Sequence, residues 1–181
     1  MKYRKFGNTG WEISALGFGC MRLPTRDGRG AGEQVDEKAS IDMIRRAVDR
    51  GVNYVDTAYA YHNGVGEIVV GKALADGYRD KVKLATKSPV WMIQKADDFD
   101  AFLQEQMARL RTDHIDVYLL HALSAPRWEI VRKFDILARA EAAVRDGRVG
   151  RIGFSFHDNH DMFRKIIDGS PGWSMCQIQY N

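Results

Sequence analysis

Cysteine is scarce in this chain of 181 residues, which has two cysteines, at positions 20 and 176. Two cysteines so far apart cannot form a C-x-x-C metal or redox motif, so we expect two reduced thiols in a cytoplasmic protein. No apolar run approaches the roughly 20 residues that a membrane span needs. Residues 1–8 are polar throughout and do not have the layout of a signal peptide. We therefore expect a cytoplasmic protein without a membrane partner.

A strong charge of one sign is also missing. The net charge is +3, and basic residues are interspersed with acidic ones. This pattern is typical of solvated helix and loop faces and argues against nucleic-acid binding. Hydrophobic residues make up 45% of the chain and charged residues 28%, which is an ordinary globular composition. The length suits one domain, and we expect residues 1–181 to form it.

Short hydrophobic runs and helical periodicity alternate along the chain. Two runs at 3–6 and 11–14 flank the turn formers Asn8 and Gly10, which predicts a β-hairpin. Strands are then expected at 16–19, 52–56, 81–87, 115–121, 149–154 and 175–179. Helices are expected at about 36–50, 65–75, 128–145 and 161–168, and a polar loop at 24–35. A further helix, capped by Asp97 or Asp98, should include Phe99 to Leu110. Strict alternation implies a parallel sheet with right-handed crossovers.

The glycine pattern of a nucleotide-binding Rossmann sheet is missing as well. Gly17-Phe18-Gly19 has no third glycine at the required spacing, and a long loop follows before the first helix. This favours a (β/α)8 TIM barrel with an N-terminal β-hairpin. About six of the eight strands are present, and a full barrel usually takes about 250 residues. We therefore expect a barrel domain that is incomplete at its C-terminus.

Ionisable residues stand at the ends of three successive predicted strands: Asp56, Lys87 and His121. Each alone has an ordinary explanation, as a turn residue, a surface charge or a core histidine. In a barrel these strand ends share one mouth, together with Tyr61 from the loop after Asp56. A lysine beside a tyrosine lowers the phenol pKa, a carboxylate can pair with the lysine, and a histidine can hydrogen-bond a substrate oxygen. Such a set suits protonation of a carbonyl oxygen during hydride transfer from a cofactor.

Six motifs together resemble the aldo-keto reductase family along essentially the whole chain. They are GFGCMRLP at 17–24, DTAYAYHNGVGE at 56–67, ATK at 85–87, YLLH at 118–121, GFS at 153–155 and QIQYN at 177–181. The resemblance implies a (β/α)8 barrel with an N-terminal hairpin. It also implies an oxidoreductase that reduces aldehydes or ketones, small-molecule carbonyl substrates, with NADPH or NADH.

The resemblance also assigns roles to individual residues. The catalytic residues it implies are Asp56, Tyr61 as the general acid, Lys87 and His121. The cofactor-binding residues it implies are Gly19, Cys20, Met21, Asp56 near the nicotinamide ribose, and Ser155 and Gln177 at the carboxamide. The sequence departs from many relatives after Ser155, where Phe156 replaces an asparagine. GFGCMRLP and GFSFH are closest to a subgroup that often carries a C-terminal ferredoxin-like iron–sulfur segment, whose cysteines do not occur in residues 1–181.

Other interpretations stay open at this point. The chain could be a non-catalytic cofactor-binding or regulatory member of the same fold, or an inactive fragment. A metal-dependent barrel hydrolase is a third class, but no metal site is predicted, because the run 157–161 is better explained as a helix cap. Trp91 and Met92 could line a substrate pocket or cover the core. The particular substrate, the choice between NADPH and NADH, and the oligomeric state are not indicated.

Overall fold

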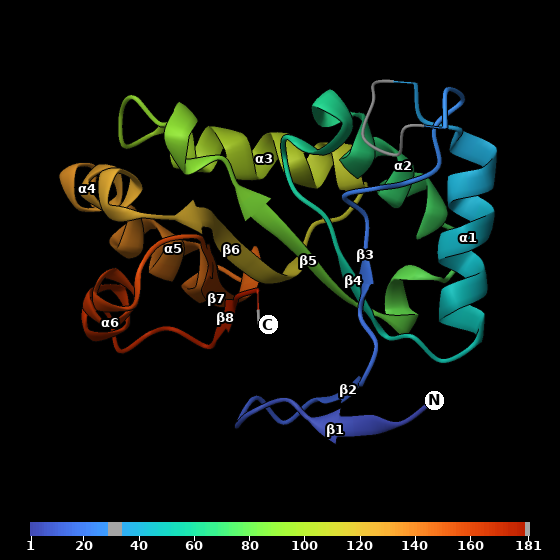
Figure 1. Cartoon of the computed structure of the whole chain (residues 1–181), viewed down its shortest axis with the longest axis horizontal. Helices are drawn as coiled ribbons and strands as arrows, with labels where there is room; N and C mark the ends of the chain where they lie inside the picture. Colours follow the sequence, from blue (N-terminus) through green and yellow to red (C-terminus); the bar gives the residue numbers. More distant parts are fainter. Residues whose placement is uncertain (29–33, 180–181) are drawn as a thin grey trace. The chain divides into compact units, whose positions relative to one another are not determined.

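A computed structural model of the chain describes residues 1–28 and 34–179 (Figure 1). Its internal contacts divide the chain into two compact units. The first unit comprises Met1–Thr86 and Gln106–Asp113, and the second comprises Lys87–Glu105 and His114–Asn181. The division falls inside strand β5 (Lys83–Ser88) and inside helix α3 (Asp98–Leu110). Each unit is described in turn.

The first unit begins with the predicted hairpin, in which β1 (Tyr3–Lys5) and β2 (Glu12–Ser14) pair antiparallel. Three strands then pair in parallel in the order β3 (Phe18–Gly19), β4 (Tyr54–Asp56) and β5. Helices α1 (Glu37–Asp49) and α2 (Val65–Ala73) contact each other in this unit (Figure 1). The parallel pairing places the carboxyl ends of β3, β4 and β5 at one edge, as in other α/β folds.

Local sequence signals explain these elements. The Asp36 side chain caps α1 by accepting a hydrogen bond of 3.0 Å from the backbone N of Ala39, and Ile44 and Val48 form the buried face of the helix. Gly71 allows α2 to approach the end of α3 closely, because a Cβ there would lie 2.6 Å from the carbonyl oxygen of Arg109. A larger residue at this position would therefore separate the two helices.

The second unit contains the parallel strands β6 (Ile115–Leu123), β7 (Val149–Phe156) and β8 (Met175–Gln177). Its helices are α4 (Ala125–Lys133), α5 (Ile136–Arg145) and α6 (His160–Asp168). Tyr118, Leu119 and Leu120 are buried in β6. The ring of Phe99 packs edge-on against Tyr118, with centroids 5.5 Å apart, so the start of α3 covers the core of this unit.

The single helix predicted at 128–145 is wrong. The structure has two helices, α4 and α5, separated at Phe134 and Asp135. Asp135 has φ 50°, a left-handed conformation that ends a helix. No glycine or proline marks the break, and aspartate is among the few other residues that tolerate this conformation. Helical periodicity continues across the break and hides it.

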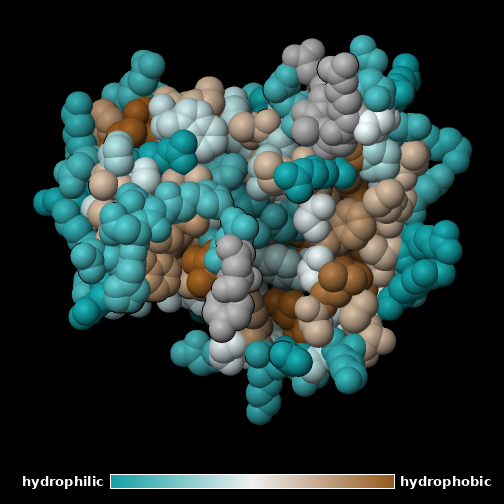
Figure 2. Space-filling view, in the orientation of Figure 1, coloured by the Kyte–Doolittle hydropathy of each residue, from teal (hydrophilic) through white to brown (hydrophobic). Residues whose placement is uncertain are grey.

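The α/β class, the parallel strands and the N-terminal hairpin are confirmed. Residues 29–33 of the expected polar loop and the last two residues of QIQYN lie outside the described residues. No helix in the described ranges is both long and apolar enough to cross a bilayer. Hydrophilic side chains cover much of the face in Figure 2, and hydrophobic ones are exposed at separate places. The expectation of one domain over residues 1–181 stays a prediction.

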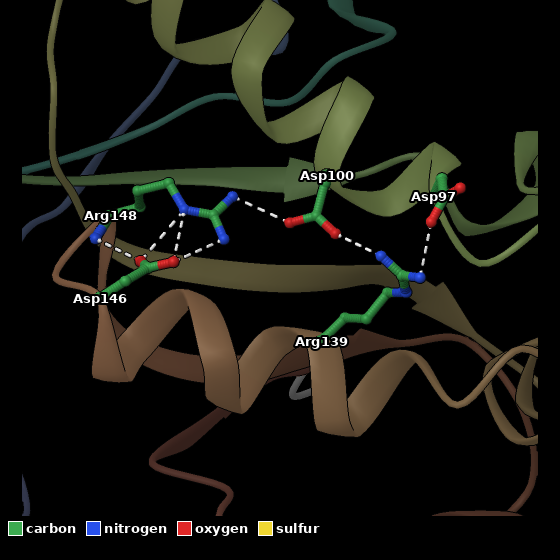
Figure 3. Close-up of polar contacts among 5 residues, drawn as sticks. All are labelled: Asp97, Asp100, Arg139, Asp146 and Arg148. Carbon is green, nitrogen blue, oxygen red and sulfur yellow. Dashed lines mark hydrogen bonds and ion pairs between the residues drawn. The ribbon is translucent and has the colours of Figure 1, made fainter.

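An ion-pair network joins α3 to α5 and to the start of β7 in the second unit (Figure 3). The carboxylate of Asp100 accepts from Arg139 at 2.7 Å and from Arg148 at 2.9 Å. Arg139 also pairs with Asp97, and Arg148 with Asp146. These side chains are partly exposed, so solvent weakens each pair, but the shared Asp100 couples two arginines that come from different elements.

We expect Asp100→Asn to lower the thermal midpoint by about 2–4 °C, which is the shift of a small stability loss in a chain of this size. The amide keeps the shape of the side chain but loses the charge that both arginines share. Thermal unfolding at low and high salt measures the effect, which should shrink as salt screens the wild-type network. Asp161→Asn, at a fully exposed carboxylate, is the control. Equal shifts at both salt concentrations would contradict the electrostatic explanation.

Candidate functional site

In the first unit, Asp56 is the last residue of β4 and lies opposite Gly19 in β3. The backbone N of Cys20 donates to the carbonyl oxygen of Asp56 at 2.8 Å, and both residues are buried. Met21, the next residue, is 52% exposed. The structure thus brings together Asp56 and two of the predicted cofactor-binding residues, Gly19 and Cys20, while Met21 faces solvent.

Tyr61 begins a tight loop between β4 and α2. Three consecutive residues in this loop have left-handed backbone: His62 with φ 52°, Asn63 with φ 53° and Gly64 with φ 87°. For residues other than glycine this conformation costs roughly 1–2 kcal/mol each. His62 anchors the loop, because its buried Nε2 accepts a hydrogen bond of 3.1 Å from the backbone N of Leu23. Surrounding contacts therefore hold the backbone directly after Tyr61, at His62 and Asn63, in a costly conformation.

A buried carboxylate lies just after this loop, on α2. Oε1 of Glu67 accepts from Oγ1 of Thr86 and from Nε2 of Gln106, each at 2.6 Å. Oε2 accepts from Nη1 of Arg109 at 3.3 Å, and the carboxylate is fully buried. Burial raises the pKa of Glu67 above its usual value, while the bonds from Thr86, Gln106 and Arg109 oppose the rise. The sequence reasoning gave Glu67 no role.

Arg109 connects this carboxylate to the loop of Tyr61. Its guanidinium lies over the ring of Tyr59, 4.3 Å from the centroid, and Nη1 is 3.4 Å from the carbonyl oxygen of Tyr59. At the other end of the loop, a Cβ on Gly64 would lie 3.2 Å from Arg109. Arg109 thus contacts both ends of the segment that carries Tyr61, and its charge is offset by Glu67.

In the second unit, His121 lies near the carboxyl end of β6, where the pairing with β7 shifts register. The next residue, Ala122, is left-handed, with φ 51°. Its backbone N donates to Oγ of Ser155 at 2.6 Å, and its carbonyl oxygen accepts from Nη1 of Arg127 at 2.7 Å. Ser155 pairs in register with Gln177 of β8. His121, Ser155 and Gln177 are therefore brought together at the carboxyl ends of three neighbouring strands.

The electrostatic surroundings keep His121 neutral. Burial lowers its pKa to about 3, and the positive charges of Lys87 and Arg127, together with His157, act in the same direction. Lys87 is itself 99% buried, since its exposed fraction is 1%. The ring of Trp91 lies beside the imidazole, with centroids 5.3 Å apart. A neutral imidazole can donate one hydrogen bond and accept another near neutral pH.

The depressed pKa of His121 makes stability depend on pH. Between the unfolded pKa near 6.5 and the folded value of about 3, the unfolded chain binds more protons, so stability falls as the pH falls through this window. We expect wild type to lose about 3 kcal/mol more between pH 7 and pH 4 than His121→Asn, which does not titrate. Urea unfolding at both pH values measures the difference. Equal losses in the two proteins would show that His121 has an ordinary pKa when folded.

One further prediction is decided by the structure. Oδ1 of Asn159 caps α6 by accepting from the backbone N of Met162, which confirms the helix-cap explanation of the run 157–161. Within residues 1–28 and 34–179, no group of three His, Cys, Asp or Glu side chains could hold a metal ion. Trp91 and Met92 are 39% and 40% exposed, and the ring of Trp91 lies beside that of His121. Arg127 was missed, because nothing in its local sequence distinguishes it from other helix arginines.

Comparisons with known proteins identify the family of the chain. The model of the aldo/keto reductase family matches residues 15–181. The chain is 33% identical over 174 residues to the aldo-keto reductase YhdN of Bacillus subtilis, covering 92% of this chain and 51% of that protein. It is 33% identical over 162 residues to the probable aldo-keto reductase 1 of Glycine max, covering 83% and 44%. The chain thus spans about half the length of the curated relatives that it matches.

Solved structures give the same result. The thermostable aldo-keto reductase Tm1743, in complex with the inhibitor epalrestat, matches with a TM-score of 0.79 and 29% identity, covering 100% of this chain and 63% of that one. The holo form of the aldo-keto reductase AKR11C1 from Bacillus halodurans matches with a TM-score of 0.76 and 28% identity, covering 99% and 58%. These matches confirm the predicted partial (β/α)8 barrel. The chain belongs to the aldo/keto reductase family.

Proposed function

We propose that the protein reduces an aldehyde or ketone by hydride transfer from NADPH or NADH, with Asp56, Tyr61, Lys87 and His121 as its catalytic residues. The observation that carries the proposal is the position of three of them. Asp56, Lys87 and His121 each lie at or near the carboxyl end of a parallel strand, where (β/α)8 barrels build their active sites. Membership of the aldo/keto reductase family supports the reaction class.

The chain's residues fit a nicotinamide cofactor. Ser155 and Gln177 lie opposite each other on β7 and β8 and together offer both donors and acceptors for a carboxamide. Oγ of Ser155 accepts from the backbone N of Ala122, which leaves its hydroxyl hydrogen to donate. At the end of β3, no atom lies within 4 Å of a Cβ placed on Gly19, so the backbone there has open space beside it. When bound, the cofactor supplies the hydride.

The side chains would handle the proton and the developing negative charge. Tyr61 donates the proton to the carbonyl oxygen as that oxygen gains charge. In the roles that the family resemblance implies, Lys87 would assist this proton transfer and Asp56 would support Lys87. His121 is neutral, because its pKa is about 3, so it can hydrogen-bond the carbonyl oxygen without carrying a charge. The left-handed residues His62 and Asn63 follow Tyr61 directly, so the loop would help to position its side chain for the substrate.

The test is NADPH oxidation by the purified 181-residue chain with an unhindered aromatic aldehyde, with the alcohol product quantified against NADPH consumed. A one-to-one ratio is the expected result. A fluorescence titration with NADPH, run in parallel, separates a reductase from a member that only binds the cofactor. Cofactor binding without any alcohol would favour the non-catalytic alternative. Absence of both would overturn the proposal for this chain.

A further inference from the structure

Arg127, on the first turn of α4, carries a positive charge that no carboxylate balances in the part of the chain that the structure describes. The side chain is half-buried, and its Nη1 donates to a neutral group, the carbonyl oxygen of Ala122, at 2.7 Å. The neighbouring carboxylate of Asp158 is engaged elsewhere, since it accepts from the backbone N of Ala125 and of Asn159. An arginine in such surroundings keeps most of its five N–H donors available.

The guanidinium has a fixed position. It lies over the ring of Trp91, 4.9 Å from the centroid, and the same ring lies 5.3 Å from the ring of His121. Trp91 is 39% exposed, so this platform is open to solvent on part of its surface. Trp91 therefore contacts both the arginine and the residue proposed to orient the carbonyl.

Three basic side chains lie close enough to His121 to affect its pKa. Beyond the effect of burial, the pKa of His121 is lowered by Lys87, Arg127 and His157, as expected for basic groups. Among the described residues, no carboxylate contributes to this change in pKa. A neutral carbonyl compound gains little from these charges when it binds, although they favour the negative charge that its oxygen gains during reduction. A ligand that carries a negative charge would be attracted to these basic groups and could accept two parallel hydrogen bonds from the planar guanidinium.

We propose that Arg127, held on Trp91, binds an anionic group of the substrate, so that the enzyme prefers carbonyl compounds that carry a carboxylate. This inference rests on the proposed function, but the binding experiment that tests it does not require catalysis. The bond from Nη1 to Ala122 leaves one edge of the guanidinium for the carboxylate, while the reacting carbonyl would be held at His121. Arg127 is then a residue that determines specificity and takes no part in proton transfer.

The test compares ligands of one shape and different charge. Benzoate and benzamide are titrated calorimetrically into the 181-residue chain, with and without NADPH. We expect benzoate to bind at least about tenfold more tightly, which is the usual effect of hydrogen bonds to a charged group. Arg127→Gln should remove this preference, and Arg127→Lys should keep part of it. Arg132→Gln removes one charge from the exposed side of the same helix and should leave the preference unchanged.

Kinetics give the same comparison for substrates. The ratio of kcat/KM for 4-carboxybenzaldehyde to that for its neutral methyl ester should fall at least about tenfold in Arg127→Gln, through KM, while turnover of the ester is retained. If no aldehyde is reduced by any variant, the proposed function fails and the benzoate titration still decides the inference. Thermal unfolding of Arg127→Gln checks that the lost bond to Ala122 has not unfolded the unit.

Two outcomes would overturn the inference. The first is equal affinity for benzoate and benzamide in wild type, or a preference that persists in Arg127→Gln. The second is a loss of NADPH affinity in Arg127→Gln with unchanged benzoate binding, which would assign the arginine to a phosphate of the cofactor. A preference for benzoate that disappears only in Arg127→Gln and weakens with added salt would support the substrate assignment.

Discussion

Tyr61→Phe is expected to lower the rate of carbonyl reduction by about 10²- to 10⁴-fold, the usual contribution of a positioned general acid. The change removes the hydroxyl that donates the proton and keeps the ring, so the left-handed loop can retain its shape. Single-turnover oxidation of bound NADPH is the measurement, because it isolates the chemical step from product release. The affinity for NADPH should stay within about twofold, since no role in cofactor binding is assigned to the hydroxyl.

Tyr59→Phe is the matched control for this experiment. It removes a hydroxyl from the same loop, two residues earlier, and keeps the ring against which Arg109 packs. Its rate should stay close to that of wild type. Full activity in Tyr61→Phe, or an equal loss in Tyr59→Phe, would show that the proton comes from another group.

Arg109→Met should destabilise the protein by about 3–5 kcal/mol, the usual effect of removing one partner of a buried ion pair. The carboxylate of Glu67 would stay fully buried with its bonds from Thr86 and Gln106 but without a balancing charge. Its pKa is already raised by burial and should rise further without Arg109. Urea unfolding of the two proteins at pH 7 measures the difference. Arg132→Met, at an exposed arginine, is the control and should change stability little.

Two observations would identify the uncompensated charge as the cause. When a carboxyl group has a raised pKa in the folded protein, the protein loses stability as the pH rises above the unfolded pKa of that group. The stability lost in Arg109→Met should therefore become smaller from pH 7 toward pH 4.5. Adding Glu67→Gln to Arg109→Met should recover most of the lost stability, because the amide oxygen still accepts from Thr86 and Gln106. A double variant no more stable than Arg109→Met would point instead to the lost packing against Tyr59.

Features that depend on neighbours in sequence could be predicted. Asp36 and Asn159 cap helices as their residue types and positions indicate, and alternating runs predict the order of parallel strands. The break between α4 and α5 could not be predicted, because Asp135 adopts its left-handed backbone without a local glycine or proline. Features that a local sequence pattern determines could be predicted, whereas a backbone conformation that depends on tertiary packing could not.

The same division applies to the candidate site. The positions of Asp56 and His121 at strand ends follow from hydrophobic runs that stop at a polar residue. The partnership of Glu67 with Arg109 joins residues 42 apart, and no pattern within either helix indicates it. The role proposed for Arg127 depends on its contact with Trp91, a residue 36 positions earlier in the sequence. Contacts between residues so far apart in the sequence form only when the strands and helices are packed together, so local sequence patterns do not indicate them.

The left-handed loop after Tyr61 also has a consequence for the order of folding. Chains before folding rarely hold two residues such as His62 and Asn63 in this conformation at once, so the loop should form after the strand and helix that flank it. Its anchors, Arg109 and the backbone N of Leu23, come from distant parts of the chain and are absent until late. Substitutions in this loop should therefore speed unfolding more than they slow folding. The segment that carries the proposed proton donor would be among the first to open when the native state fluctuates.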